Sequence, residues 1–297
     1  MRITESRIAS DFLYNVNNAR ERINTLQNQL SSGTRVNAPS DDPEAADLIL
    51  RLNAGIGRNE QFSSNVGAAQ AMLSTTADSL DSVQQVIGQL QTTMTQVSNG
   101  AEATNIPTFA DTIDGYLKQA VAIANTEFNG KYVFAGTQTQ TQPYVLTPNA
   151  APPPSQTVTF NGNAGKIDYA VSEGQTQTVN VSGQEAFDGT ALFSRMIAIS
   201  DNLRAGITPS AADVTAVQNS LQTVLNTSGR AGAVLQGLDS TSAHLSQQHI
   251  QLLSLRSMQQ DTDFPAATLS LKQEQTTLDA ALAVGAKILP KSLIDFL

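Results

Sequence analysis

The sequence contains no cysteine and no tryptophan, and it is poor in aromatic and charged residues. Only 5% of its 297 residues are aromatic and only 14% are charged. The absence of cysteine excludes disulfides and thiolate metal sites. A single spherical core of this size would need more large side chains, whereas long helices that each bury a narrow stripe need fewer. The composition therefore favours long packed helices over a compact globular domain.

Positive charge is also scarce. The formal net charge is −9 and the sequence pI is about 4.6, so nucleic acid and anionic membranes would repel the chain and neither is expected as a partner. No apolar run reaches the roughly 18 residues that a membrane-spanning helix requires. The start "MRITESRIASDF" lacks the apolar stretch of a cleaved secretory signal. We therefore expect either a cytosolic protein or export without a cleaved signal.

Motifs that carry chemistry are missing as well. The two histidines, His244 and His249, are five residues apart and point to different faces of a helix, whereas zinc-binding pairs on helices use a spacing of four. The acidic run from Asp41 to Glu44 lacks the alternating spacing of a calcium loop. No phosphate-binding loop or nucleophile elbow is present. We expect no catalytic residue, no cofactor and no metal, and hence no enzyme.

The two ends of the chain carry coiled-coil patterns. Near each end, apolar residues recur in steps of three and four and form a stripe one residue wide. Such a helix cannot bury its stripe alone, so we expect both stripes to be buried between chains on assembly. The predicted assembly interface consists of Phe12, Val16, Ala19, Ile23, Leu26 and Leu30 in the N-terminal helix, and Leu271, Leu278, Leu282, Leu289, Leu293 and Phe296 in the C-terminal helix.

The segment "SSGTRVNAPSDDP" (31–43) interrupts the first helical pattern. Gly33 suits the left-handed conformation that ends a helix. Asp42 is a good N-cap when Pro43 takes the first helical position, and Asp41 with Glu44 is the alternative capping box. The predicted inter-helix loop contains Gly33, Arg35, Asn37, Pro39, Asp41, Asp42 and Pro43. This segment is therefore expected to be a shaped connection between two helices.

The middle of the chain changes period. Long helical patterns flank a stretch of short alternating runs that predicts four to six strands. The predicted segments are an assembly helix with its linker (1–42), one half of a helical rod (43–129), a β-rich module (130–186), the other half of the rod (187–260) and a second assembly helix (261–297). The predicted fold is mainly α with a small β-rich module, an elongated antiparallel coiled-coil-like bundle with the module at its tip.

Four ordered motifs resemble the bacterial flagellin superfamily, and in particular its hook-associated protein 3 branch. They are "LSSGTRVNAPSDDPEAA" (30–46), "NGKYVFAGTQT" (129–139), "GRAGAVLQGLDS" (229–240) and the end "AKILPKSLIDFL" (286–297). Flagellins usually have an A-K-D-D-A type of block where this chain has Pro39 to Pro43, so flagellin itself is the alternative within the superfamily. Pro265 and Pro290 depart from an uninterrupted C-terminal helix.

The resemblance implies a flagellin-like fold and a structural, catalytically inert protein that joins the flagellar hook to the filament. It implies secretion without a cleaved signal through the flagellar type III export channel, an extracellular location, and assembly through both terminal helices. The implied partners are like subunits in a ring or helical layer, another hook-associated protein on the hook side, flagellin on the filament side and an export chaperone. A secreted coiled-coil adhesin or effector, or an intracellular coiled-coil scaffold, are the alternatives outside the superfamily.

Overall fold

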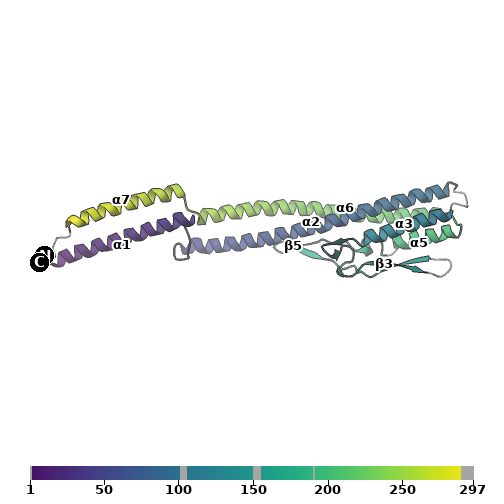
Figure 1. Cartoon of the computed structure of the whole chain (residues 1–297), viewed down its shortest axis with the longest axis horizontal. Helices are drawn as coiled ribbons and strands as arrows, with labels where there is room; N and C mark the ends of the chain where they lie inside the picture. The colour runs from purple at the N-terminus through teal and green to yellow at the C-terminus, as the bar shows by residue number, and fades with distance from the viewer. Residues whose placement is uncertain (1, 101–105, 150–154, 190, 289–297) are drawn as a thin grey trace. The chain divides into compact units, whose positions relative to one another are not determined.

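The computed structural model describes residues 2–100, 106–149, 155–189 and 191–288. Figure 1 shows the elements in chain order. The helices are α1 (Arg2–Ser32), α2 (Pro43–Ser98), α3 (Ile106–Ala124), α4 (Gly183–Ala186), α5 (Ala191–Arg204), α6 (Ala211–Gln260) and α7 (Phe264–Ile288). The strands are β1 (Glu127–Phe128), β2 (Lys131–Tyr132), β3 (Tyr144–Asn149), β4 (Ser155–Phe160), β5 (Asp168–Ser172) and β6 (Gln175–Thr178). The prediction of a mainly helical fold with a small β-rich part is confirmed.

The chain packs into two compact units. The terminal unit comprises Met1–Arg58 and Gln248–Leu297, and the central unit comprises Asn59–Gln247. The boundaries between the two units lie inside α2 (residues 58/59) and inside α6 (residues 247/248). The sequence instead predicts the boundaries of the assembly helices at residues 42 and 260. The five-segment division stays a prediction.

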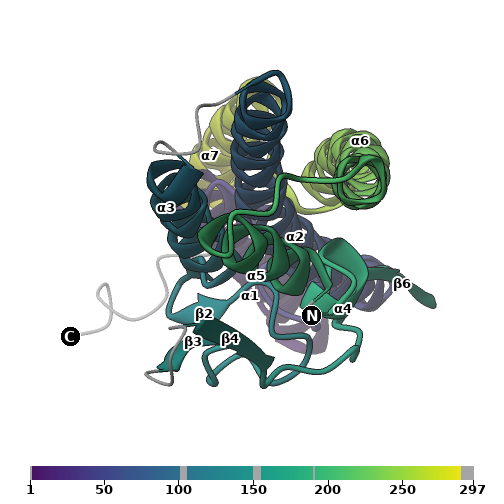
Figure 2. The ribbon, with the colours of Figure 1, turned by 90° about the vertical axis from the view of Figure 1, so that its right-hand side faces the viewer.

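The core of the central unit follows the predicted helical stripes. On α2 the apolar residues at steps of three and four are buried, from Val66 to Val97. On α6 burial recurs at every seventh residue, at Val217, Val224, Ala231, Leu238 and Leu245. A seven-residue period keeps one narrow side of a helix against its neighbour, which is how this unit builds a core from few aromatic residues. Next to these helices, α3 and α5 pack side by side (Figure 2).

The strands form three antiparallel hairpins, β1–β2, β3–β4 and β5–β6, and within the described residues they do not join into one sheet. Five of the six strands lie in the predicted β-rich segment, and β1 precedes it. Two of the predicted strand runs are strand only in part, because Val133 and Phe134 after β2, and Val179 and Val181 after β6, leave the ladder and are buried in the core. These four residues pack in the core instead of extending the strands. The loop expected at 149–155 lies mostly outside the described residues.

An aromatic cluster holds the hairpins to the helices. It consists of Phe134, Tyr144, Phe160, Phe187 and Phe193, whose rings lie 4.8 to 5.8 Å from their neighbours. The Tyr144 hydroxyl donates to the Gly189 carbonyl at 3.0 Å, and burial raises the pKa of this phenol. Gly183 has no space for a side chain, because a Cβ there would lie 2.3 Å from the Tyr144 oxygen.

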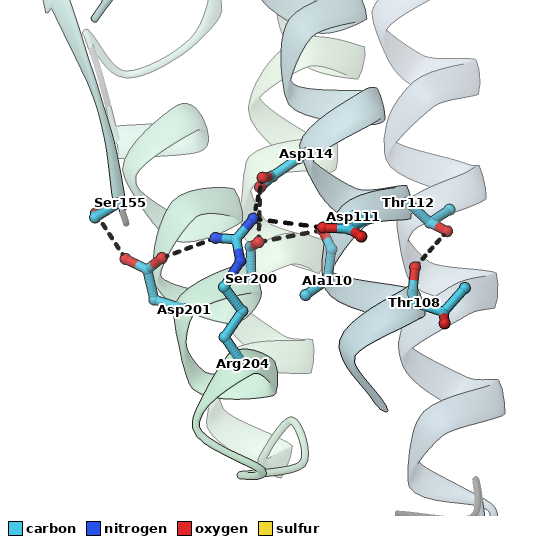
Figure 3. A network of polar contacts seen from close by, with 9 residues as sticks. All are labelled: Thr108, Ala110, Asp111, Thr112, Asp114, Ser155, Ser200, Asp201 and Arg204. Atoms are coloured by element: carbon cyan, nitrogen blue, oxygen red, sulfur yellow. Dashed lines mark hydrogen bonds and ion pairs between the residues drawn. The ribbon is translucent and has the colours of Figure 1, made fainter. Parts of the chain in front are cut away.

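A polar network joins α5 to α3 and to β4 (Figure 3). The Arg204 guanidinium, in the last turn of α5, contacts Asp114 of α3 and lies 3.3 Å from a carboxylate oxygen of Asp201. Asp201 in turn accepts a hydrogen bond from Ser155 of β4 at 2.9 Å, and Asp111 lies 3.8 Å from Arg204. Because Arg204 and Asp114 are largely buried, the network fixes the α5 end by charge-assisted bonds that water screens little.

Candidate assembly interface

In the terminal unit, α1 and α7 pack against each other (Figure 1). Three contacts define their register: Phe12 lies against Gly285, Arg22 pairs with Glu274, and Gly33 lies beside Phe264. Along these three contacts the residue numbers increase in α1 and decrease in α7, so the two helices run antiparallel. The two terminal helices of one chain are therefore partners of each other.

Phe12 and Gly285 make the closest of these contacts. A Cβ on Gly285 would lie 2.2 Å from the tip of the Phe12 ring, closer than real Cβ atoms approach other groups. Glycine at this position lets the aromatic ring lie directly on the backbone of α7. A larger residue would displace the ring and separate the helices at this level.

Arg22 and Glu274 form a bidentate pair. The Nε atom of Arg22 lies 2.8 Å from one carboxylate oxygen of Glu274, and an NH2 group lies 3.1 Å from the other. These bonds lower the pKa of Glu274 and raise the pKa of Arg22. Because bidentate geometry has a single good alignment, the pair is consistent with the register that the other two contacts define. A polar cleft of about 510 Å³ surrounds it, lined by Arg22, Thr25, Leu26, Gln29, Ser270, Gln273, Glu274 and Thr277.

The described residues of the predicted stripes are buried or half-buried within the single chain, except Leu282. Val16 and Ala19 are buried, Phe12, Ile23, Leu26, Leu30, Leu271 and Leu278 are half-buried, and Leu282 is 39% exposed. Leu289, Leu293, Phe296 and Pro290 lie outside the described residues, whereas Pro265 lies in the first turn of α7 without breaking it. The stripes thus lie along a contact between α1 and α7, and their burial between chains stays a prediction.

The turn between α1 and α2 has the geometry expected from its sequence. Gly33 follows the last residue of α1 with φ at +74°, in the left-handed region. Asp42 caps α2, since one of its carboxylate oxygens accepts from the Ala45 amide at 3.1 Å. This bond, and next the one from Arg35, lower the pKa of Asp42. Pro43 is the first residue of α2.

The alternative capping box of Asp41 and Glu44 is wrong. The Asp41 carboxylate accepts from the backbone amides of Asn37 and Ala38, both at 2.9 Å. Asp41 therefore closes the turn that precedes the helix, and Asp42 alone caps it. Pro39 is exposed in the same turn.

The α1–α2 turn is also bonded to the α6–α7 turn. The Arg35 amide donates to the Gln260 carbonyl at 2.6 Å, and the Thr262 amide donates to the Gly33 carbonyl at 3.0 Å. The Arg35 guanidinium donates both to Asp42 and to the Gln259 carbonyl, each at 3.0 Å. The two breaks in the helical pattern thus form one joint, which we call the paired turns. Sequence reasoning identified each break and missed the bonds between them.

Large apolar side chains on the surface are concentrated in the terminal unit. Thirteen are exposed in the described residues, and all but Ile207 and Leu225 belong to this unit. They are Leu13, Tyr14, Leu48, Leu50, Ile250, Leu255, Met258, Phe264, Leu269, Leu282 and Val284. Of these residues, the predicted assembly interface includes only Leu282. Leu13 and Tyr14 could have been found, because they are apolar residues beside the predicted stripe.

The described residues show no group of three or more potential metal ligands among His, Asp and Glu. In the same parts of the chain, every helix falls short of the combination of length and hydropathy needed to cross a bilayer.

The chain is similar to known flagellar proteins. The family described as the bacterial flagellin N-terminal helical region matches residues 3–139. Flagellar hook-associated protein 3 of Escherichia coli is 26% identical over 281 residues, which cover 85% of this chain and 86% of that protein. The chain is similar to members of the bacterial flagellin superfamily along most of its length. The predicted resemblance is confirmed.

Other members of the flagellin superfamily are similar over shorter parts or in fold. A flagellin of Serratia marcescens is 28% identical over 126 residues, covering 42% of this chain and 36% of the flagellin. Among solved structures, flagellar hook-associated protein-3 from Legionella pneumophila covers 76% of this chain and 99% of its own, with a TM-score of 0.60 at 16% identity. The match with FlgL from Bacillus cereus covers 70% of this chain and 99% of that structure, with a TM-score of 0.59 at 17% identity. These structures share the flagellin-like fold.

Proposed function

We propose that this chain is a structural component of the bacterial flagellum, the hook-associated junction protein that connects the hook to the filament. The observation that carries the proposal is the similarity to hook-associated protein 3 along 85% of the chain and 86% of that relative. A match of this extent spans most of both long helices and the hairpins between them. In this proposal the protein lies outside the cell, in the flagellum, and serves assembly without catalysis.

The terminal unit supplies the assembly surface in this proposal. Its two helices are linked by the Arg22–Glu274 pair and joined at their base by the paired turns. Large apolar side chains are exposed on both helices, among them Leu13 and Leu269, and burial of apolar area is the main driving force of protein association. We propose that segments 1–42 and 261–297, including the stripes predicted from the sequence, serve assembly.

The proposed partners follow from the position of a junction. Like subunits form its own ring or layer, another hook-associated protein contacts it on the hook side, and flagellin contacts it on the filament side. An export chaperone would cover the apolar ends in the cytoplasm, and export would proceed through the flagellar type III channel without a cleaved signal. The acidic net charge of −9 fits protein partners better than nucleic acid or anionic lipid.

Deletion of the gene tests the proposal. A strain without this chain should be non-motile, with hooks that electron microscopy shows to be intact and bare, and with flagellin lost to the medium. Supplying the intact gene should restore filaments. Normal filaments in the deletion strain would contradict the proposal and favour the adhesin, effector or scaffold alternatives.

Flagellin is the second candidate. It is favoured by the match of the flagellin N-terminal helical region to residues 3–139 and by the similarity to the Serratia flagellin. The two candidates differ in abundance, because a filament subunit is the main protein of sheared filaments and a junction protein is a trace component. Quantitative mass spectrometry of sheared filaments separates them.

A further inference from the structure

A cleft of about 200 Å³ is formed entirely by residues of the central unit, and we call it the central cleft. It is lined by α6, by Leu73 of α2 and by the segment 164–185, which includes β6 and α4. Leu73, Val181 and Ala231 give it a buried apolar part. Pockets for drug-sized ligands measure roughly 300–1,000 Å³, so this cleft fits only a small group.

The central cleft is positively charged, although the unit around it is acidic. Residues 59–247 contain 14 Asp and Glu and six Lys and Arg, a formal net charge of −8. Two of these six cations, Lys166 and Arg230, line the cleft, and Glu185 is the one carboxylate among the described residues that line it. The cleft therefore attracts an anion that the net charge of the unit repels.

The loop that carries Lys166 has no regular secondary structure, and side-chain amides hold it in place. The Asn180 amide accepts from the Ile167 backbone at 2.7 Å and donates to the Gly165 carbonyl at 2.8 Å, so it binds the residues on both sides of Lys166. Asn180 itself is 9% exposed. The Asn163 side chain accepts from the Gly165 amide at 2.9 Å. Lys166 is thus an exposed cation on a fixed loop, as expected of a loop that binds a ligand.

The central cleft also has hydrogen-bond donors to spare. The Arg230 guanidinium contacts Glu185 through one nitrogen and one oxygen, and a guanidinium has five N–H donors. The Ser182 side chain is buried, and its oxygen accepts from the Glu185 amide at 3.3 Å. Within the described residues the hydroxyl proton of Ser182 has no acceptor. An ammonium, a guanidinium and a hydroxyl beside apolar side chains match a carboxylate with a short aliphatic part.

We propose that the central cleft binds the carboxylate of a small aliphatic acid. Lys166 and Arg230 hold the carboxylate, and the buried apolar residues cover the aliphatic part. Glu185 contacts Arg230 in the free protein and so competes with the ligand for the guanidinium. A free acid and the C-terminal residue of a peptide share this chemistry. The inference goes beyond the proposed function and does not depend on it.

Titration of the purified chain tests the binding. The probes are isocaproate, as a free acid, and N-acetyl-leucine, as a peptide terminus, and N-acetyl-leucinamide is the uncharged control. Isothermal calorimetry should show saturable binding of an acid with a dissociation constant on the order of 1 mM, and binding of the amide at least about ten times weaker. Tighter binding of isocaproate identifies a free acid as the ligand, and tighter binding of N-acetyl-leucine identifies a peptide terminus. Equal binding of acid and amide, or no saturation by either acid up to about 50 mM, would overturn the proposal.

Three charge variants separate the cleft from the general electrostatics of the chain. Lys166→Gln should weaken binding of the tighter acid by at least about fivefold, because it removes a charge-assisted bond. Glu185→Gln should strengthen binding by at least about twofold, because it removes the competing carboxylate. The matched control Lys118→Gln removes an equal charge from an exposed position on α3, outside the cleft, and should leave binding unchanged. All three side chains are exposed, so the thermal unfolding of each variant should match that of the unaltered chain. Weaker binding by Glu185→Gln, or an equal effect of Lys118→Gln and Lys166→Gln, would overturn the proposal.

Discussion

Gly33 offers the sharpest test of how the paired turns work. Its φ of +74° lies in the left-handed region, which an L-residue reaches at a cost of about 1–2 kcal/mol. Space is not the limit, because a Cβ at this position would meet nothing closer than the Phe264 ring at 3.8 Å. Gly33→Val should therefore cost backbone strain with little steric clash. Gly33→Asn should cost less, because asparagine tolerates the left-handed region.

Hydrogen exchange measures this cost locally. The Thr262 amide donates to the Gly33 carbonyl, so it reports the opening of the paired turns. A loss of 1–2 kcal/mol corresponds to opening that is about 5 to 30 times more frequent, and the exchange of this amide should accelerate by that factor in Gly33→Val. Thermal unfolding of the central unit should stay unchanged, since its core contains no residue of the turn.

Three substitutions at Gly33 should differ in their effect. Exchange of the Thr262 amide should be slowest in Gly33→Asn, faster in Gly33→Ala and fastest in Gly33→Val. The control is Gly57→Ala, which adds a methyl group to α2 in the same unit where nothing lies within 4 Å. This control should leave exchange at the turn unchanged, because alanine suits a helix better than glycine. Equal exchange in Gly33→Val and Gly33→Asn would show that the left-handed backbone is not what Gly33 provides.

Three further predictions concern the core, the buried tyrosine and the Arg22–Glu274 pair. Gly183→Ala should destabilise the central unit by about 1–3 kcal/mol in urea unfolding through overpacking against Tyr144, whereas the control Gly88→Ala, with open space around it, should not. Because burial raises the pKa of Tyr144, its phenol should be the last to ionise in an absorbance titration, well above the ordinary value of about 10, and Tyr144→Phe should remove this last step. Stability should fall as pH rises above about 10, because the folded state keeps the proton that the unfolded state loses. Because Arg22 lowers the pKa of Glu274, the contribution of this pair to α1–α7 pairing should be complete at pH 7 and be lost as pH falls below the ordinary glutamate pKa of about 4.3. The circular dichroism of Glu274→Gln should be insensitive to the same change in pH.

The helices could be predicted from the sequence because their signals are local. Steps of three and four fix the buried side of α2 and α6, and the capping residues Gly33 and Asp42 lie within a few residues of the helix ends that they determine. Such rules act through the nearest turn of backbone, so one sequence is enough to read them.

The contacts between distant segments could not be predicted in the same way. The stripe on α1 required a partner, but the sequence does not show whether that partner is α7 of the same chain or a helix of another copy. Arg22 was recognisable only as a charged residue beside the stripe, because its partner Glu274 is 252 residues away. The bond between Arg35 and Gln260 joins backbone groups, which every residue carries, so no residue type announces it.

The position of the protein along the flagellum tests the central claim most directly. Intact flagella are labelled with gold-coupled antibody raised against the purified chain and viewed by electron microscopy. A junction protein should be labelled in one narrow band at the boundary between hook and filament. Label along the whole filament would identify a flagellin, and label on the cell surface without flagella would contradict the account.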